Sequence, residues 1–216
     1  MVRTAETYDR FEKPLANLLD VLQADLLHRR MDTEVLCHER NEILRTWPRT
    51  RPPQTTLVAQ RLPACDFLDV TEAAAAHAPT HHIVAGLAPL LNLLRWSYSY
   101  PVHPKWPELA AHVAFAEIIG SRGLADGDGI HLGLTLMAPR THYPMHSHPA
   151  IELYLVLSGV ARWRVTGESF KPQVPGSLIL HHSGIGHAMV TDAEPLLALY
   201  VWRGDLVSPS VFTDES

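Results

Sequence analysis

Apolar positions in the first half of the chain recur with the period of an α-helix. Five leucines near its start fall at i, i+3, i+4, i+7 and i+11, on one side of an amphipathic helix: Leu15, Leu18, Leu19, Leu22 and Leu26. A second helix is predicted over residues 32–44, with Asp32 or Thr33 as its N-cap. The prolines of residues 46–54 indicate a linker, and helices are predicted again over residues 88–96 and 107–119.

The pattern changes to the alternation of β-strands after a turn-rich boundary at residues 121–129. Strands are predicted over residues 131–137, 152–157, 161–165, 177–180 and 196–202, with turn residues between them. Several short strands at this spacing favour a sandwich or barrel. The expected fold is therefore mainly β, with a helical N-terminal region at residues 1–124 packed on a β-barrel at residues 125–216.

One segment, residues 143–154, concentrates side chains that can bind a metal or move a proton. His146, His148, Glu152 and Tyr154 are separated by even numbers of residues. Residues of one parity share a face of a strand, so an extended segment would point all four groups into one space. The pattern predicts a metal site inside the barrel.

Composition narrows the classes of function further. The formal net charge of −5 and the lack of a Lys or Arg run exclude a basic surface for nucleic acid, whereas 14 histidines favour metal or proton chemistry. Cys37 and Cys65 are the two cysteines, so no disulfide framework is expected and both are interpreted as structural. No apolar run reaches about 18 to 20 residues and the charged start shows no signal peptide, so we expect a cytoplasmic protein without a membrane partner.

Two spacings resemble the two motifs of the cupin superfamily, namely His146-x-His148-x3-Glu152-x6-Gly159 and Gly176-x5-His182-x-Gly184-x2-His187. The resemblance implies a small jelly-roll barrel that holds one divalent metal ion through histidines and a glutamate. Three positions depart from the motifs, in turn geometry and not in ligand chemistry: Arg140 replaces a glycine, His182 a proline and Thr191 an asparagine. Imidazole and carboxylate ligands suit Zn, Fe, Mn, Ni or Co, and the spacing does not select among them. An empty barrel with structural histidines is the alternative.

The order Tyr143, His146, His148, Glu152, Tyr154, His187 and Trp202, together with residues 94–101, resembles the cupin-type dimethylsulfoniopropionate lyases of marine bacteria. That resemblance implies metal ligation by His148, Glu152 and His187, with His146 completing the set. It implies that Tyr154 is the general base and an occasional ligand, Tyr143 a second catalytic or substrate-positioning phenol, and Trp202 a substrate contact. The substrate would be a small sulfonium carboxylate, cleaved to dimethyl sulfide and acrylate.

Other readings stay open at this point. Another metal-dependent cupin enzyme such as a dioxygenase, or a non-catalytic cupin that binds a small ligand, would share the ligand pattern. His81 and His82 are interpreted as surface residues of a loop. His181 and His182 receive no role, and alternation predicts that at least one is solvated. Arg162 and Arg164 fit an exposed strand face better than a carboxylate-binding role, and the N-terminal helices are a candidate homodimer face.

Overall fold

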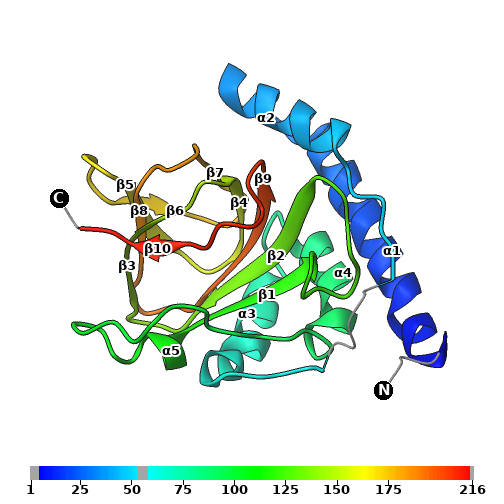
Figure 1. The fold of residues 1–216 in the computed structure, drawn as a ribbon, viewed down its shortest axis with the longest axis horizontal. Helices are drawn as coiled ribbons and strands as arrows, with labels where there is room; N and C mark the ends of the chain where they lie inside the picture. Colours follow the sequence, from blue (N-terminus) through cyan, green and yellow to red (C-terminus); the bar gives the residue numbers. More distant parts are fainter. Residues whose placement is uncertain (1–4, 53–57, 215–216) are drawn as a thin grey trace.

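The computed structural model describes residues 5–52 and 58–214, with helices in the first half of the chain and strands in the second (Figure 1). The helical elements are α1 (Ala5–His28), α2 (Glu34–Arg45), the 3-10 helix η1 (Pro63–Phe67), α3 (Leu68–Ala75), α4 (His81–Leu91) and α5 (Leu109–His112). Within this described part, no helix has the length and apolar character needed to cross a bilayer.

The first two helices form where the apolar period predicts them. The five leucines of α1 are all buried. Thr33 is the N-cap of α2, because its backbone is extended and its hydroxyl accepts a hydrogen bond from the Leu36 amide at 3.2 Å. The pattern does not predict η1 and α3.

The helix predicted over residues 88–96 is displaced toward the N-terminus, because α4 begins at His81 and ends at Leu91. Pro89 therefore lies inside the helix and not in its first turn. The loop predicted around His81 and His82 is wrong, since these residues form the first turn of α4. His81 is exposed, and the His82 ring lies 3.0 Å from the Asp25 carboxylate of α1.

The strands form two antiparallel sheets that face each other as a jelly-roll barrel, which confirms the expected fold class. One sheet has the order β1 (Val113–Ile119), β2 (Ile130–Met137), β9 (Leu196–Arg203), β4 (Ile151–Ser158) and β7 (Leu178–His181). The other has the order β10 (Val211–Phe212), β3 (His142–Ser147), β8 (His187–Thr191), β5 (Ala161–Val165) and β6 (Lys171–Gln173).

The helix predicted over residues 107–119 is wrong. Only Leu109–His112 is helical, and Val113–Ile119 forms β1, which pairs antiparallel with β2. Alternate residues of β1 enter different cores: Ala114, Ala116 and Ile118 pack with the helices, whereas Val113 and Phe115 face the barrel interior. A strand buried on both faces is a continuous apolar run, which periodicity alone does not distinguish from a buried helix.

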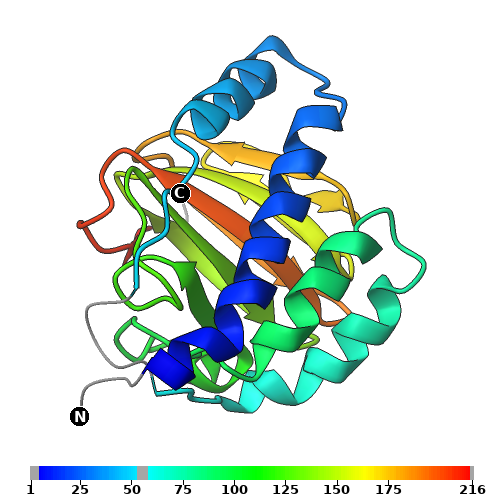
Figure 2. The same cartoon turned by 90° about the vertical axis from the view of Figure 1, so that its right-hand side faces the viewer.

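The helices cover the outer face of the sheet that contains β4, as Figure 2 shows. Alternation along β4 divides its side chains between two cores. Leu153, Leu155 and Leu157 pack against the helices. Glu152, Tyr154 and Val156 have the opposite parity and point into the barrel. This double packing fixes the register of β4, since a slip by one residue would place Glu152 among leucines.

Candidate metal centre

A cavity of about 340 Å³ opens into the barrel between the two sheets. Six of the predicted site residues line it: Tyr143, His146, His148, Glu152, Tyr154 and Trp202. The seventh, His187, does not line the cavity, and its Nε2 lies 3.3 Å from Glu152 Oε2. Three further aromatic residues of the lining, Tyr100, Phe115 and Tyr200, were not predicted, because they come from a loop and two strands far apart in sequence.

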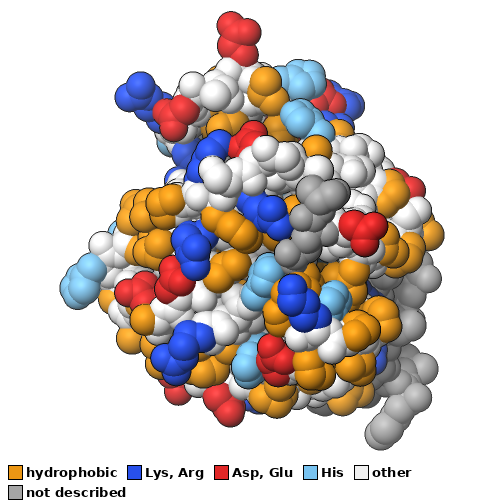
Figure 3. Space-filling model, turned by 90° about the vertical axis from the view of Figure 1, so that its left-hand side faces the viewer, with side chains coloured by type: hydrophobic (Ala, Val, Ile, Leu, Met, Phe, Trp, Pro, Cys, Tyr) orange, Lys and Arg blue, Asp and Glu red, His pale blue; other side chains and the backbone are white. Residues whose placement is uncertain are grey.

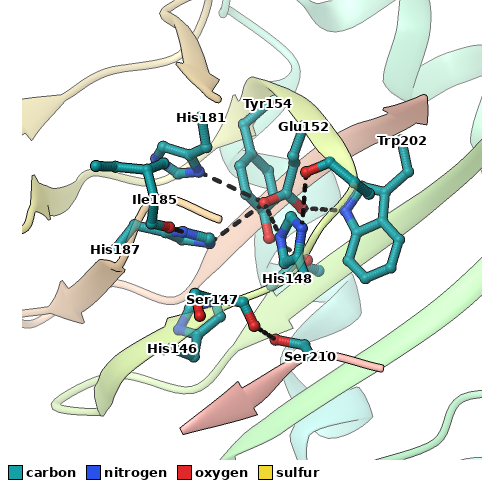
Figure 4. Close-up of polar contacts among 12 residues, drawn as sticks. His146, Ser147, His148, Glu152, Tyr154, His181, Ile185, His187, Trp202 and Ser210 are labelled. Carbon is teal, nitrogen blue, oxygen red and sulfur yellow. Dashed lines mark hydrogen bonds and ion pairs between the residues drawn. The ribbon is translucent and has the colours of Figure 1, made fainter. Parts of the chain in front are cut away.

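The parity argument assumed that residues 143–154 are extended, but this segment contains a turn. Strand β3 ends at Ser147 and β4 begins at Ile151, and the two strands belong to different sheets. The side chains still converge, because the turn folds His148 back over Glu152 (Figure 4). His148 Nε2 lies 3.0 Å and His187 Nε2 3.3 Å from Glu152 Oε2, and the potential ligand atoms of these three buried residues lie within 4.8 Å of one another.

Backbone carbonyls fix the tautomer of each histidine. A carbonyl oxygen only accepts hydrogen bonds, so a ring nitrogen bonded to it carries the proton and the other nitrogen of a neutral ring carries a lone pair. In each of three rings Nδ1 donates to a carbonyl two residues away: His146 to Pro144 (2.9 Å), His148 to Ala150 (3.0 Å) and His187 to Ile185 (3.1 Å). All three therefore present Nε2 as the free ligand atom.

These tautomers leave the centre short of positive charge. The Nε2 lone pairs of His148 and His187 face Glu152 Oε2 across about 3 Å, and His187 Nε2 makes no hydrogen bond within the described residues. Burial raises the pKa of Glu152, but its contacts with the three neighbouring histidines outweigh burial and hold that pKa well below its usual range, so the acid is ionised. A buried carboxylate that faces two imidazole lone pairs is a set of donor atoms that fits a borderline divalent metal ion.

Two donors hold the Glu152 carboxylate from outside this trio. The indole Nε1–H of Trp202 donates to Glu152 Oε1 at 2.7 Å. Trp202, the predicted substrate contact, thus also donates a hydrogen bond to Glu152, a candidate metal ligand. His181 Nδ1 lies 3.4 Å from Glu152 Oε2. His181 is buried and His182 exposed, so the prediction that at least one of the pair is solvated is confirmed.

His146 lies beside the trio. Its ring stacks on Tyr143 with 3.9 Å between centroids and meets the His187 ring at 4.0 Å. Burial lowers the pKa of His146 well below its usual range, so this ring is neutral. The structure therefore places His146 at the cavity wall with an available Nε2, outside the compact group of His148, Glu152 and His187.

The two predicted phenols both reach the cavity. The Tyr154 hydroxyl lies 3.3 Å from Thr135 Oγ1, and the Tyr143 hydroxyl lies 2.5 Å from that of Tyr100. Tyr100 in turn donates to Ser210 Oγ in the C-terminal segment. Burial raises the pKa of Tyr154 and of Tyr143, and the Glu152 charge adds to this effect at Tyr154, so both phenols are protonated here.

The remaining candidates lie outside the site. Arg162 makes an exposed ion pair with Asp192 at 2.8 Å, as expected for an outward strand face, and the Arg164 guanidinium lies over the Phe170 ring. Cys37 and Cys65 are free thiols. Figure 3 shows the side of the molecule that lies on the left in Figure 1. Lys and Arg are interspersed there with Asp and Glu, without a continuous basic patch.

Arg140 explains one departure from the cupin motif. Its φ of +53° lies in the left-handed region that glycine adopts without strain. The backbone here therefore has a conformation that favours glycine, the residue that the motif would place at this position.

The sequence profile of the family described as dimethylsulfoniopropionate lyase matches residues 39–198. The chain belongs to this family. It is 36% identical to DddL of Cereibacter sphaeroides, assigned as a dimethylsulfoniopropionate lyase, over 71% of this chain, and the match spans 62% of the length of DddL. It is 31% identical to the dimethylsulfoniopropionate lyase DddQ of Ruegeria pomeroyi, over 67% of this chain and 70% of DddQ.

The fold agrees with this assignment to the family. The crystal structure of DddQ from Ruegeria pomeroyi superposes with a TM-score of 0.75 at 25% identity, and the match covers 94% of this chain and 97% of that one. The likeness extends over nearly the whole chain, so it includes the helical elements as well as the barrel.

Proposed function

We propose that this protein is a metal-dependent carbon–sulfur lyase that cleaves dimethylsulfoniopropionate to dimethyl sulfide and acrylate. The observation that carries the proposal is a buried carboxylate, Glu152, faced by imidazole lone pairs beside the Tyr154 phenol in a cavity lined with aromatic rings. Family membership and the named activity of DddL and DddQ support the substrate. In this proposal one divalent ion is bound per chain.

The metal would be held by His148, Glu152 and His187, with Nε2 of His146 completing the set. When bound, a divalent ion supplies positive charge that attracts a substrate carboxylate and makes the adjacent C–H more acidic. Zn, Fe, Mn, Ni and Co all accept these ligands.

Aromatic faces suit the other end of the substrate. A sulfonium group is cationic and has no N–H to donate, so hydrogen-bond acceptors recognise it poorly and ring faces recognise it well. Trp202, Tyr200 and Phe115 line the same cavity as Glu152. A cation over an aromatic face gains roughly 0.5 to 2 kcal/mol, depending on desolvation. The cavity therefore combines groups suited to the carboxylate and groups suited to the sulfonium of one small zwitterion.

Tyr154 acts as the general base in this proposal. Burial keeps its phenol protonated in the structure described here, and positive charge nearby favours the phenolate. The phenolate removes a proton from the carbon next to the substrate carboxylate. The C–H electron pair becomes the new C=C bond, the C–S bond breaks, and the sulfur leaves with that bonding pair as neutral dimethyl sulfide. Acrylate remains, and the proton stays on Tyr154 until solvent takes it.

Product analysis tests this function. Purified protein supplied with each candidate metal in turn should release dimethyl sulfide from dimethylsulfoniopropionate, as measured by gas chromatography, with or without oxygen. Oxygen-dependent turnover would indicate a dioxygenase instead. Substrate binding without any product, under every metal, would indicate a non-catalytic binding cupin.

A further inference from the structure

His181 is a buried histidine of the centre that no cupin motif includes. It lies on β7 directly across the antiparallel ladder from Glu152 on β4, so the two side chains share a face. Its neighbours Leu178 and Leu180 pack against the helical core, whereas Ile179 and His181 face the barrel. Its ring stacks on His187 with 3.8 Å between centroids and 23° between the planes.

The hydrogen bonding of His181 differs from that of the other three histidines. Their Nδ1 atoms donate to backbone carbonyls, whereas His181 Nδ1 lies 3.4 Å from Glu152 Oε2. A carboxylate oxygen only accepts, so this contact places the proton on Nδ1. His181 Nε2 is buried and has no hydrogen-bond partner within the residues that the structure describes. The nitrogen that faces the centre is therefore a donor and not a lone pair.

His181 is also screened from the substrate. It is 1% exposed and does not line the cavity, unlike His146 and His148. This position favours an indirect role, through the contacts of His181 with Glu152, His187 and Tyr154.

We propose that His181 is a positioning residue, whose Nδ1–H holds Glu152 Oε2 in place for the metal. The Trp202 indole N–H holds the other carboxylate oxygen, Oε1. The inference rests on the proposed metal dependence of the enzyme. With both oxygens hydrogen-bonded, the carboxylate plane is fixed before the ion arrives. Hydrogen-bond partners of metal ligands are typically worth about 10–100-fold in metal affinity.

Two substitutions separate the hydrogen bond from the ring stack. His181→Asn keeps an N–H donor near the position of Nδ1 and loses the ring, whereas His181→Phe keeps a ring beside His187 and loses the donor. His182→Phe, at the exposed neighbour, is the matched control. Zinc affinity is measured on the metal-stripped full chain by competition with a chromophoric chelator, and folding is checked by circular dichroism. His181→Leu replaces the Phe variant if that variant does not fold.

We expect His181→Phe to weaken zinc binding about 10–100-fold, His181→Asn to remain within a few-fold of wild type, and His182→Phe to leave the affinity unchanged. Wild-type affinity in His181→Phe would overturn the inference, because the donor would then be dispensable. Equal losses in the Asn and Phe variants would overturn it too, and so would a loss as complete as that of His187→Ala, which indicates a direct ligand. Wild-type protein that takes up no zinc or other divalent ion contradicts the proposed function itself, a result distinct from all of these.

Discussion

The bond from the Trp202 indole to Glu152 can be tested separately from any contact of that ring with substrate. Trp202→Phe keeps an aromatic face in the cavity and removes the N–H that donates to Glu152 Oε1 at 2.7 Å. Hydrogen bonds to charged groups contribute about 1.5–3 kcal/mol, and leaving a buried carboxylate oxygen without its donor costs a similar amount. We expect metal-free Trp202→Phe to lose at least this much free energy of unfolding.

A double-mutant cycle isolates the bond from the loss of indole volume. Glu152→Met removes the acceptor and keeps a side chain of similar length, so the cycle of Trp202→Phe and Glu152→Met reports the coupling between the two groups. Urea unfolding of the four metal-free proteins, followed by circular dichroism, should give a coupling of about 1.5–3 kcal/mol. Trp106→Phe, at a partly buried tryptophan that does not line the cavity, controls for the general effect of losing an indole. A coupling below about 0.5 kcal/mol, the usual error of additivity, would refute the reasoning.

Three further outcomes are expected. Tyr154→Phe should lower turnover by about 10²–10⁴-fold, the typical worth of a general base, while inductively coupled plasma analysis finds its metal content unchanged; a parallel loss of metal would make the phenol a structural ligand. Gly133→Ala should cost about 1–3 kcal/mol of stability in a thermal melt, because a Cβ there would lie 2.6 Å from the Ala116 carbonyl oxygen and against the Tyr200 phenol; an unchanged melting temperature would contradict this close packing. Burial lowers the pKa of His131 below 6.5, so the unfolded chain binds its proton first and stability should fall as pH drops below about 6.5; His131→Phe should reduce that slope in urea titrations, and an unchanged slope would contradict it.

The sequence predicts those parts of the fold that depend on local spacing. The leucines of α1 and the Thr33 cap act within a few residues of themselves, and the parity of Glu152 and Tyr154 places both inside the barrel. Strand β1 was missed because burial on both faces removes the alternation that identifies a strand. Its identity depends on pairing with β2 and on the helices outside it, and neither is a local property of residues 113–119.

Some residues of the candidate site can likewise be predicted from local spacing, whereas others depend on how distant strands pair. Motif spacing identifies His148, Glu152 and His187, which the structure brings together. It does not identify His181, because its place opposite Glu152 depends on the register between β4 and β7. It also misses Tyr100 and Ser210. The Tyr100 hydroxyl contacts those of Tyr143 and Ser210, so it joins a loop to a strand and to the C-terminal segment. The parity argument for residues 143–154 assumed an extended segment, and the turn after Ser147, which contains Pro149, interrupts that segment.

The imidazoles of His146, His148 and His187 are each oriented by a carbonyl oxygen that belongs to the main chain. Any amino acid at positions 144, 150 and 185 supplies that oxygen, so the aim of these rings survives changes in the neighbouring side chains. Glu152 is different, because both of its oxygens depend on the side chains of other strands. We therefore expect substitutions beside the histidines to leave this centre intact, whereas a change at position 181 or 202 removes a contact of the carboxylate itself.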